Sequence, residues 1–278
     1  MASSRRTRLA VLGSPIHHSL SPAIQSAAYR ALGLPWKYSA IEMTGERLPE
    51  FVAHLDESWR GLSLTMPLKR DILPLLDWRH PLVDRVGAAN TVLLTEEGVR
   101  GFNTDVRGAV EAFREAGVQS LDTVHILGAG ATAASLLVAA VELGASSALV
   151  SARTPERAVG LSELGEREGI DVTVRAWGVS DRSLRIPDAV ISTVPGGGND
   201  LVFPEAVREA SVLFDVAYDP WPTQLATSWG ETGGRVISGY DLLVHQAVGQ
   251  VRIFVSGDLE RALPDEPAVI AAMRGALS

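Results

Sequence analysis

The stretch Val124-His125-Ile126-Leu127-Gly128-Ala129-Gly130-Ala131-Thr132-Ala133 determines the fold that we predict for this 278-residue chain. Its first four residues are largely apolar and predict a buried strand, and the apolar run that continues to Leu143 predicts a helix. Between them, a Gly-x-Gly-x-x-Ala pattern allows a tight turn and lets a pyrophosphate approach the backbone N–H groups at the helix start. The stretch therefore predicts a dinucleotide-binding strand–turn–helix unit, with a turn that binds nothing as the alternative.

The same alternation of short apolar runs and helical patterns continues along most of the chain, which is typical of α/β proteins with largely parallel sheets. Strands are expected over residues 8–12, 37–42, 61–64, 91–94, 123–127, 148–151, 172–175, 189–192 and 212–215. Helices are expected to start near residues 21, 47, 69 and 105 and to span 132–143, 155–165, 239–255 and 267–276. The order predicts an N-terminal domain, an inserted nucleotide-type domain, and a C-terminal helical segment that folds back on the first domain.

Composition excludes several classes of function. The formal net charge is −8, which argues against a nucleic-acid partner, because such a partner requires a basic face. The absence of cysteine rules out disulfides, thiolate metal sites and a cysteine nucleophile. The chain starts with polar residues and has no apolar segment of membrane length, so we expect a cytoplasmic protein without a membrane partner.

The segment that follows the second strand of the nucleotide domain indicates which cofactor is used. NAD sites place an acidic residue about twenty residues after the glycine turn, whereas this chain has Arg153 and Thr154 there. We expect Pro155 to begin a helix capped by Thr154, which puts Arg157 in a first turn where the helix dipole disfavours a cation. A 2′-phosphate would supply the missing anion, with Glu156 as the alternative partner. The sequence therefore predicts NADP rather than NAD.

Lysine is rare in this chain. Of 25 basic residues only Lys37 and Lys69 are lysines, and the other positions are arginine, which stays protonated in proteins. Lys37 enters an expected strand and fits a solvated edge charge. Lys69 follows Thr65-Met66-Pro67-Leu68 in a turn of small polar groups. We therefore interpret Lys69 as the residue that exchanges a proton.

Other polar residues stand on short turns of the first domain. Ser21 precedes Pro22 and can be explained as a helix cap, whereas Ser19 has no such explanation and is interpreted as pointing at a ligand. The adjacent pair His17-His18 is expected to diverge on its turn, and no acidic residue or third histidine is spaced to complete a metal site. We therefore predict no metal.

Amide and carboxylate groups precede the nucleotide domain at Asn90 and Asp105. Such groups at turns suit a polyhydroxylated ligand, and a carboxylate near Lys69 would orient it and tune its pKa. The alternative for Asp105 is an acid that complements the dipole at a helix start.

These pieces together resemble the shikimate dehydrogenase family over nearly the whole chain. The motifs that carry the resemblance are Gly13-Ser14-Pro15-Ile16-His17-His18-Ser19-Leu20-Ser21-Pro22, Leu64-Thr65-Met66-Pro67-Leu68-Lys69, Gly87-Ala88-Ala89-Asn90-Thr91, Asn103-Thr104-Asp105, Gly128-Ala129-Gly130-Ala131-Thr132-Ala133, Ala152-Arg153-Thr154, Asp215-Val216-Ala217-Tyr218-Asp219-Pro220 and Gly239-Tyr240-Asp241-Leu242-Leu243-Val244-His245-Gln246. Each motif alone is weak, but eight in this order are highly specific.

The resemblance implies a substrate-binding domain over residues 1–104, completed by 240–278, and a Rossmann-type NADP domain over 105–239. It implies reversible reduction of 3-dehydroshikimate to shikimate by NADPH, a step of aromatic amino-acid biosynthesis, with Lys69 and Asp105 as the catalytic pair. The substrate residues that it implies are Ser19, Ser21, Thr65, Asn90, Tyr218 and Gln246. The cofactor residues that it implies are Gly128, Ala129, Gly130, Ala131, Thr132, Ala133, Arg153, Thr154, Arg157 and Gly239. The protein is expected to be a monomer or a homodimer.

Three departures and three alternatives accompany the resemblance, and the first departure is Gln224, which stands where proline is common. Ala152 stands where the family often has asparagine, and Leu242 where methionine is usual. The nearest alternative is an NAD-dependent quinate/shikimate dehydrogenase, against which Arg153, Arg157 and Ser21 argue. The second is a non-catalytic sensor of shikimate-like acids on the same fold, and the third is a different amino-acid-type dehydrogenase on a similar two-domain plan.

Overall fold

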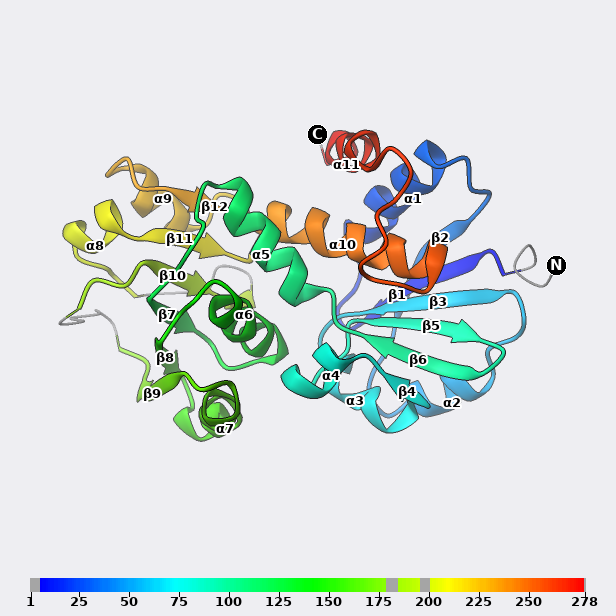
Figure 1. Ribbon diagram of the computed structural model, residues 1–278, viewed down its shortest axis with the longest axis horizontal. Coiled ribbons are helices and arrows are strands. Elements are labelled where there is room, and N and C mark those ends of the chain that lie inside the picture. Colours follow the sequence, from blue (N-terminus) through cyan, green and yellow to red (C-terminus); the bar gives the residue numbers. More distant parts are fainter. Residues whose placement is uncertain (1–5, 179–184, 196–200, 278) are drawn as a thin grey trace. The chain divides into compact units, whose positions relative to one another are not determined.

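The computed structural model describes residues 6–178, 185–195 and 201–277. The chain forms two compact units, the first made of residues 1–104 and 243–278 and the second of residues 105–242. Each unit is built on a six-stranded sheet with helices around it, so the predicted α/β class is confirmed (Figure 1).

The first unit holds a mixed sheet in the order β2-β1-β3-β5-β6-β4. Its strands are β1 (Arg8–Gly13), β2 (Lys37–Glu42), β3 (Trp59–Leu64), β4 (Trp78–Arg79), β5 (Thr91–Thr95) and β6 (Gly98–Phe102). β1 pairs in parallel with β2 and β3, whereas β5 pairs antiparallel with both β3 and β6. Three of the five pairings are thus parallel, and the two antiparallel ones both involve β5, because β5 and β6 form a hairpin whose turn uses Gly98 at a positive φ of 123°.

Successive side chains along β1 and β3 point to opposite faces of the sheet, and both faces are apolar. Ala10, Leu12, Leu62 and Leu64 share one buried cluster, which also takes in Leu48 and other residues of the two short helices that follow β2 and β3. The intervening residues point to the opposite face, as the period of two in a strand requires. The helices of the unit are α1 (Ser21–Ala31), α2 (Leu48–Ala53), α3 (Leu68–Asp71), α4 (Pro81–Val86), α11 (Glu266–Gly275) and α10 (Gly239–Ser256) from residue 243 on.

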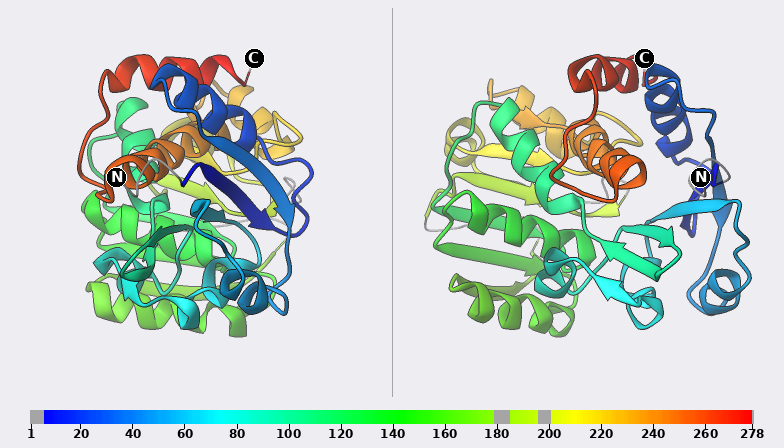
Figure 2. Two further views of the ribbon diagram at one scale, coloured as in Figure 1. Left: turned by 90° about the vertical axis from the view of Figure 1, so that its right-hand side faces the viewer. Right: turned by 45° about the vertical axis from the view of Figure 1, so that its right-hand side comes forward.

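The C-terminal helices complete the first unit, as the sequence predicts. α11 packs along α1, and the two helices lie side by side in both views of Figure 2. α10 approaches β3 closely at Gly61, where a Cβ atom would lie 2.6 Å from the Phe254 ring. The Arg60 guanidinium donates hydrogen bonds to the carbonyl groups of Phe254 and Val255 at the end of α10. Arginine at this position satisfies carbonyl groups that the helix end leaves without a partner.

A buried amide network joins α10 to the N-terminal part of the chain. Gln250 is 3% exposed, and its side-chain oxygen accepts from Gln25 Nε2 and from Ser63 Oγ, both at 2.9 Å. Its amide nitrogen donates to the Asn90 carbonyl at 3.4 Å. One side chain thus links α1, β3 and the start of β5 to the C-terminal helix, and buried polar groups need such partners to be tolerated.

The second unit is an all-parallel sheet in the order β12-β11-β10-β7-β8-β9. Its strands are β7 (Thr123–Leu127), β8 (Ser147–Ala152), β9 (Asp171–Ala176), β10 (Ala189–Ser192), β11 (Val212–Asp215) and β12 (Val236–Ile237). The helices between them are α5 (Asp105–Glu115), α6 (Ala131–Glu142), α7 (Val159–Glu168), α8 (Glu205–Ala210) and α9 (Gln224–Gly230). This is the doubly wound Rossmann order, in which the strand order reverses between β7 and β10.

Several short elements were not predicted. They are β4, α4, β6, α8, α9, β12 and the 3₁₀ turn η2 (Leu73–Leu75). β4 and β12 have two residues each, and α4 and α8 have six, so none of these is long enough to show a hydrophobic period. Within the described residues, no helix is both long and apolar enough to cross a membrane.

The Gln250 network yields a stability prediction. Gln250→Leu leaves the donors of Gln25 and Ser63 buried without an acceptor, and each such group costs roughly 1–3 kcal/mol. We expect the free energy of unfolding in urea to fall by about 2 kcal/mol or more. Gln119→Leu makes the same exchange at an exposed position and should change the free energy of unfolding by less than about 0.5 kcal/mol. Equal effects of the two substitutions would show that the network does not stabilise the unit.

Candidate active site

The polar residues predicted in the first unit lie at one edge of its sheet. β1, β3 and β6 run in the same direction and end at this edge, and the antiparallel β5 begins there. The loops at these strand ends carry Ser19, Thr65 and Asn90. The topology therefore brings these residues to the edge outside which ligands of α/β sheets bind.

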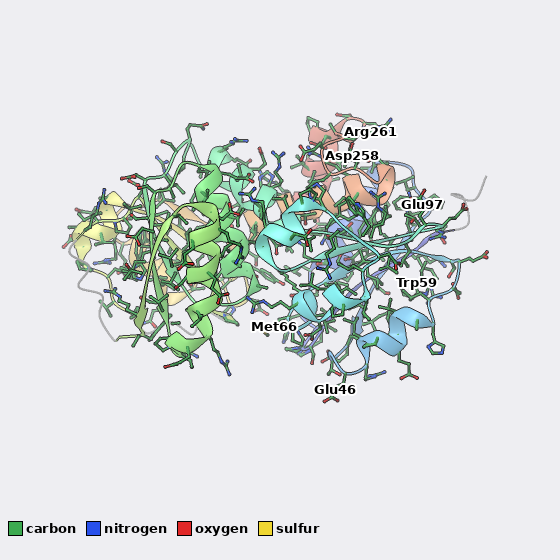
Figure 3. The ribbon with its side chains drawn as sticks, turned by 60° about the horizontal axis from the view of Figure 1, so that its bottom comes forward. Glu46, Trp59, Met66, Glu97, Asp258 and Arg261 are labelled. Carbon is green, nitrogen blue, oxygen red and sulfur yellow. The ribbon has the colours of Figure 1, made fainter. Side chains whose placement is uncertain are left out.

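The loop after β1 is held by a residue that the sequence analysis missed. Glu42, at the end of β2, accepts from Ser14 Oγ at 2.5 Å and from the Ile16 backbone N–H at 3.0 Å. The Ser14 N–H donates to the Met66 carbonyl at 2.9 Å, so this loop and the loop after β3 are joined. Met66 itself is 53% exposed, and its side chain projects from the first unit (Figure 3). An acid at the end of an edge strand gave no sequence signal of this role.

The serine pair differs from the expectation at the helix start. Ser21 is the first residue of α1 and not its cap, which is Leu20 without a side-chain cap bond. Ser19 Oγ accepts from the Ser21 backbone N–H at 3.3 Å, so Ser19 satisfies the helix start. The capping interpretation of Ser21 is therefore wrong, because the helix begins one residue earlier than expected. No hydrogen bond of the Ser21 hydroxyl is found among the described residues, which leaves it available to a ligand.

Lys69, Asn90 and Asp105 are placed by backbone and amide contacts. Lys69 lies half-buried in α3, and its carbonyl accepts from the Ala89 N–H at 2.8 Å. The buried Asn90 amide oxygen accepts from the Thr104 N–H at 2.9 Å, and its nitrogen donates to Thr104 Oγ1 at 2.9 Å. Asp105 follows directly as the buried first residue of α5. Its position at the helix start fits the dipole interpretation as well as the catalytic one.

Thr65 and Gln246 complete the first-unit set. The Thr65 N–H donates to the Leu12 carbonyl at 2.9 Å, which places it beside the end of β1. Gln246 lies on α10, where its amide donates to the Leu243 carbonyl of the same helix at 2.8 Å. Both residues are partly exposed.

The histidine pair of the first loop is not arranged as predicted. The His17 and His18 rings do not diverge but lie with their centroids 3.9 Å apart. Across the part of the chain that the structure describes, no group of three or more histidine, aspartate and glutamate side chains is arranged to hold a metal ion.

The glycine turn of the second unit leads from β7 into α6. Gly128 adopts a φ of 105°, and a Cβ there would lie 2.5 Å from Thr193 Oγ1. Gly130 is the N-cap residue of α6, and apart from its neighbours in the chain no residue comes within 4 Å of the position that its Cβ would occupy. The N–H groups at the start of the twelve-residue α6, over Ala131–Ala133, thus face an open backbone turn. The turn fits the pyrophosphate of a dinucleotide.

Arg153, Thr154 and Arg157 are all exposed after β8. Pro155 begins the 3₁₀ turn η3 (Pro155–Ala158) rather than an α-helix, and α7 starts only at Val159. Thr154 holds the cap position, but its side chain makes no cap bond. The expected cap and first α-helical turn are therefore wrong, whereas the cluster of cations at the carboxyl end of β8 is present.

Tyr218 lies on the loop between β11 and α9, and the residues at the two ends of this loop, Asp215 and Thr223, are hydrogen-bonded to each other. The buried Asp215 carboxylate accepts from Thr223 Oγ1 at 2.6 Å and from the Ala217 N–H at 3.2 Å. Burial raises the pKa of Asp215, and hydrogen bonds from Thr223 and Ala217 oppose that rise. The Tyr218 carbonyl accepts from Tyr240 Oη at 3.0 Å. The loop is therefore clamped by its own ends and by the start of α10.

Gly239 adjoins the same loop. A Cβ at this position would lie 2.3 Å from the Val216 carbonyl oxygen and 2.6 Å from that of Ala217. Glycine is needed here for the close approach of two backbones. This close approach explains why position 239 requires glycine, whether or not a cofactor binds there.

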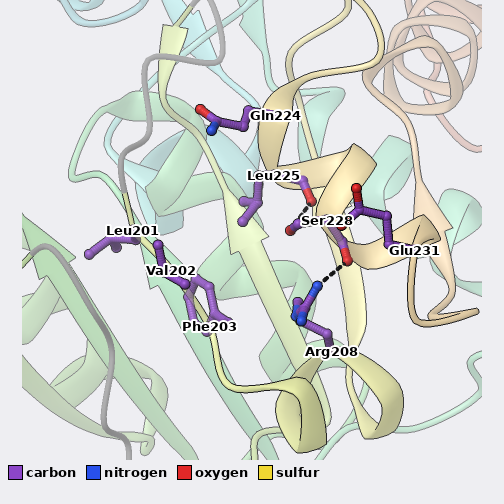
Figure 4. A pocket seen from close by; sticks show the side chains of 8 residues that line it. All are labelled: Leu201, Val202, Phe203, Arg208, Gln224, Leu225, Ser228 and Glu231. Carbon is purple, nitrogen blue, oxygen red and sulfur yellow. Dashed lines mark hydrogen bonds between the residues drawn. The ribbon is translucent and has the colours of Figure 1, made fainter.

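A separate hollow of about 270 Å³ lies beside α8 and α9 (Figure 4). Its lining residues are Leu201, Val202, Phe203, Arg208, Gln224, Leu225, Ser228 and Glu231. Arg208 donates to the Ser228 carbonyl at 2.5 Å, which ties α8 to α9. None of the predicted site residues lines this hollow.

Comparison with known proteins relates these features to one family. Residues 11–92 match the family described as the shikimate dehydrogenase substrate binding domain. A shikimate dehydrogenase (NADP(+)) from Methanothrix thermoacetophila is 35% identical, with 96% of this chain and 97% of the relative covered.

Two solved structures are similar over nearly the whole chain. The shikimate dehydrogenase of Mycobacterium tuberculosis is 36% identical with a TM-score of 0.82, covering 97% of this chain and 99% of that one. A shikimate 5-dehydrogenase from Thermus thermophilus, solved in complex with NADP(H) and shikimate, is 33% identical with a TM-score of 0.80, again covering 97% and 99%.

The Asp215 clamp gives a second stability prediction. Thr223→Val removes the hydroxyl that bonds Asp215 and that also caps α9 through the Ala226 N–H at 3.0 Å. We expect thermal or urea unfolding to show a loss of about 1–2 kcal/mol. Thr227→Val, on the exposed side of α9, is the matched control and should cost less. A loss no greater than that of the control would argue against the clamp.

Proposed function

The chain belongs to the shikimate dehydrogenase family, as its motifs predicted, and from this premise we propose that it catalyses the reversible NADPH-dependent reduction of 3-dehydroshikimate to shikimate. The observation that carries this proposal is that relatives of this name match 96–97% of the chain, including both units. The similarity therefore spans the proposed substrate side and the proposed cofactor side together.

The first unit provides the substrate side in this proposal. The hydroxyls of Ser19, Ser21 and Thr65 can each donate one oriented hydrogen bond, which suits the carboxylate and hydroxyls of shikimate. Asn90, fixed by Thr104, presents an amide near the end of β3, and Gln246 supplies a second amide from α10. Tyr218, on its clamped loop, is the residue assigned from the second unit.

Lys69 and Asp105 are the proposed acid–base pair. NADPH supplies the hydride that reduces the ring ketone. The ammonium of Lys69 donates the proton to the oxygen that becomes a hydroxyl, and in the reverse direction the amine accepts it. In this proposal Asp105 orients the lysine for the transfer and contacts the neighbouring substrate hydroxyl.

The second unit provides the cofactor side. The open turn at Gly130 and the start of α6, with Gly128, Ala129, Thr132 and Ala133, receive the pyrophosphate. Arg153, Thr154 and Arg157 bind the 2′-phosphate, since arginine offers a planar set of donors for phosphate. These cations, with no acid at the same place before Glu156, support NADP over the NAD-dependent quinate/shikimate alternative.

An assay of paired substrates and cofactors tests the function. Shikimate or quinate is offered with NADP⁺ or NAD⁺, and reduced nicotinamide is followed by absorbance. We expect fast turnover with shikimate and NADP⁺ only. Preference for NAD⁺ or equal use of quinate would instead assign the chain to the catabolic relatives, and shikimate binding without turnover would favour a sensor.

Lys69→Ala tests the catalytic assignment. General acid–base catalysis contributes roughly 100- to 10,000-fold, so we expect kcat to fall in that range with unchanged folding and NADP⁺ binding. Lys37→Ala is the matched control, because it removes the only other lysine from an exposed strand position. A Lys69 variant as active as the Lys37 variant would exclude lysine as the proton donor.

A further inference from the structure

Two strands of the second unit end side by side where the 2′-phosphate is proposed to bind. Ala152 and Ala176 are paired at the ends of β8 and β9, and the next residues are Arg153 and Trp177. The Trp177 backbone N–H donates to the Ala152 carbonyl at 2.9 Å, so the pairing of β8 with β9 continues up to Arg153 and Trp177. An arginine and an indole are thus fixed next to each other at the carboxyl edge of the sheet.

The indole is anchored, whereas the guanidinium is at the surface. Trp177 is half-buried and packs against the apolar cluster that contains Leu127, Val194 and Phe203. Arg153 is exposed, and its Cζ atom lies 5.8 Å from the centre of the Trp177 ring. A guanidinium within about 6 Å of an aromatic centroid is attracted by the ring. The ring thus restricts a long side chain that would otherwise sample many rotamers.

We propose that Trp177 is a specificity-determining residue of the cofactor site, which holds the Arg153 guanidinium where the 2′-phosphate of NADP binds. The proposal rests on the proposed function, because it deepens the assignment of Arg153. Trp177 acts through Arg153 and is a positioning residue.

The surrounding residues support this role. Ala152 is buried and has no polar side chain, so it cannot contribute a hydrogen bond to the phosphate. Arg175, the other cation near the end of β9, donates from Nε to Ser151 Oγ at 3.2 Å and is thereby directed along the sheet. Since neither Ala152 nor Arg175 is placed to bind the phosphate, its recognition after β8 depends on the few cations that follow Ala152. The orientation of the Arg153 guanidinium is therefore important for affinity.

The test compares ligands with and without the 2′-phosphate. Binding of adenosine 2′,5′-bisphosphate and of adenosine 5′-phosphate is measured by calorimetry for the wild type, Trp177→Leu and Trp177→Phe. A surface cation–π contact corresponds to about a two- to fivefold change in affinity. We expect Trp177→Leu to weaken the bisphosphate by this factor, with the monophosphate unchanged and Trp177→Phe close to the wild type.

A double-mutant cycle with Arg153→Leu separates positioning from packing. If Trp177 acts through Arg153, Trp177→Leu has little further effect on bisphosphate binding once Arg153 is replaced. Equal weakening of both ligands, or an undiminished effect without Arg153, would overturn the proposal. If the leucine variant does not fold, Trp177→Met, which keeps an apolar side chain but has no ring, serves as the test variant and should weaken the bisphosphate by the same factor. Because the readout is binding, a wild type that prefers the bisphosphate but does not oxidise shikimate would refute the function and not this inference.

Discussion

The return of α10 to the N-terminal sheet is the constraint on which the first unit depends. Gln250 joins Gln25, Ser63 and Asn90 across up to 225 positions of sequence, inside a core where an unpaired amide is costly. The second unit is therefore an insertion between two parts of one sheet-and-helix layer. Asn90 belongs to this network through its carbonyl and to the proposed site through its side chain, so stability and function share a residue.

The two units apply the same physical rule to different ligands. In each, chemistry-bearing residues follow the carboxyl ends of strands, where loops leave a rigid sheet. The first unit presents hydroxyls, amides and one lysine, which suit a hydroxylated acid, and the second presents a glycine turn and arginines, which suit a phosphorylated dinucleotide. The protein thereby supplies position and protons, and the cofactor supplies the hydride.

The long elements and the family could be predicted from the sequence because each carries a clear period or motif. β2, β7, β10 and β11 lie at the predicted residues, and α10 differs by one residue. Short elements such as β4 and α8 could not be predicted, since two or six residues show no period. The start of α1 was misplaced by one residue, and with it the capping interpretation of Ser21, because a cap depends on the residue at which helical dihedrals begin. Glu42 and Gln250 were missed because their partners are distant in sequence.

Direct reduction of a shikimate-type ketone by NADPH can be followed through the transferred hydride. The protein is incubated with 3-dehydroshikimate and NADPH that carries deuterium at C4 of the nicotinamide, in each of its two stereochemical forms, and the product is analysed by mass spectrometry. We predict shikimate that is heavier by one deuterium from one form and unlabelled from the other. Product without label from both forms, or no shikimate at all, would show that the protein does not transfer a hydride from NADPH to 3-dehydroshikimate.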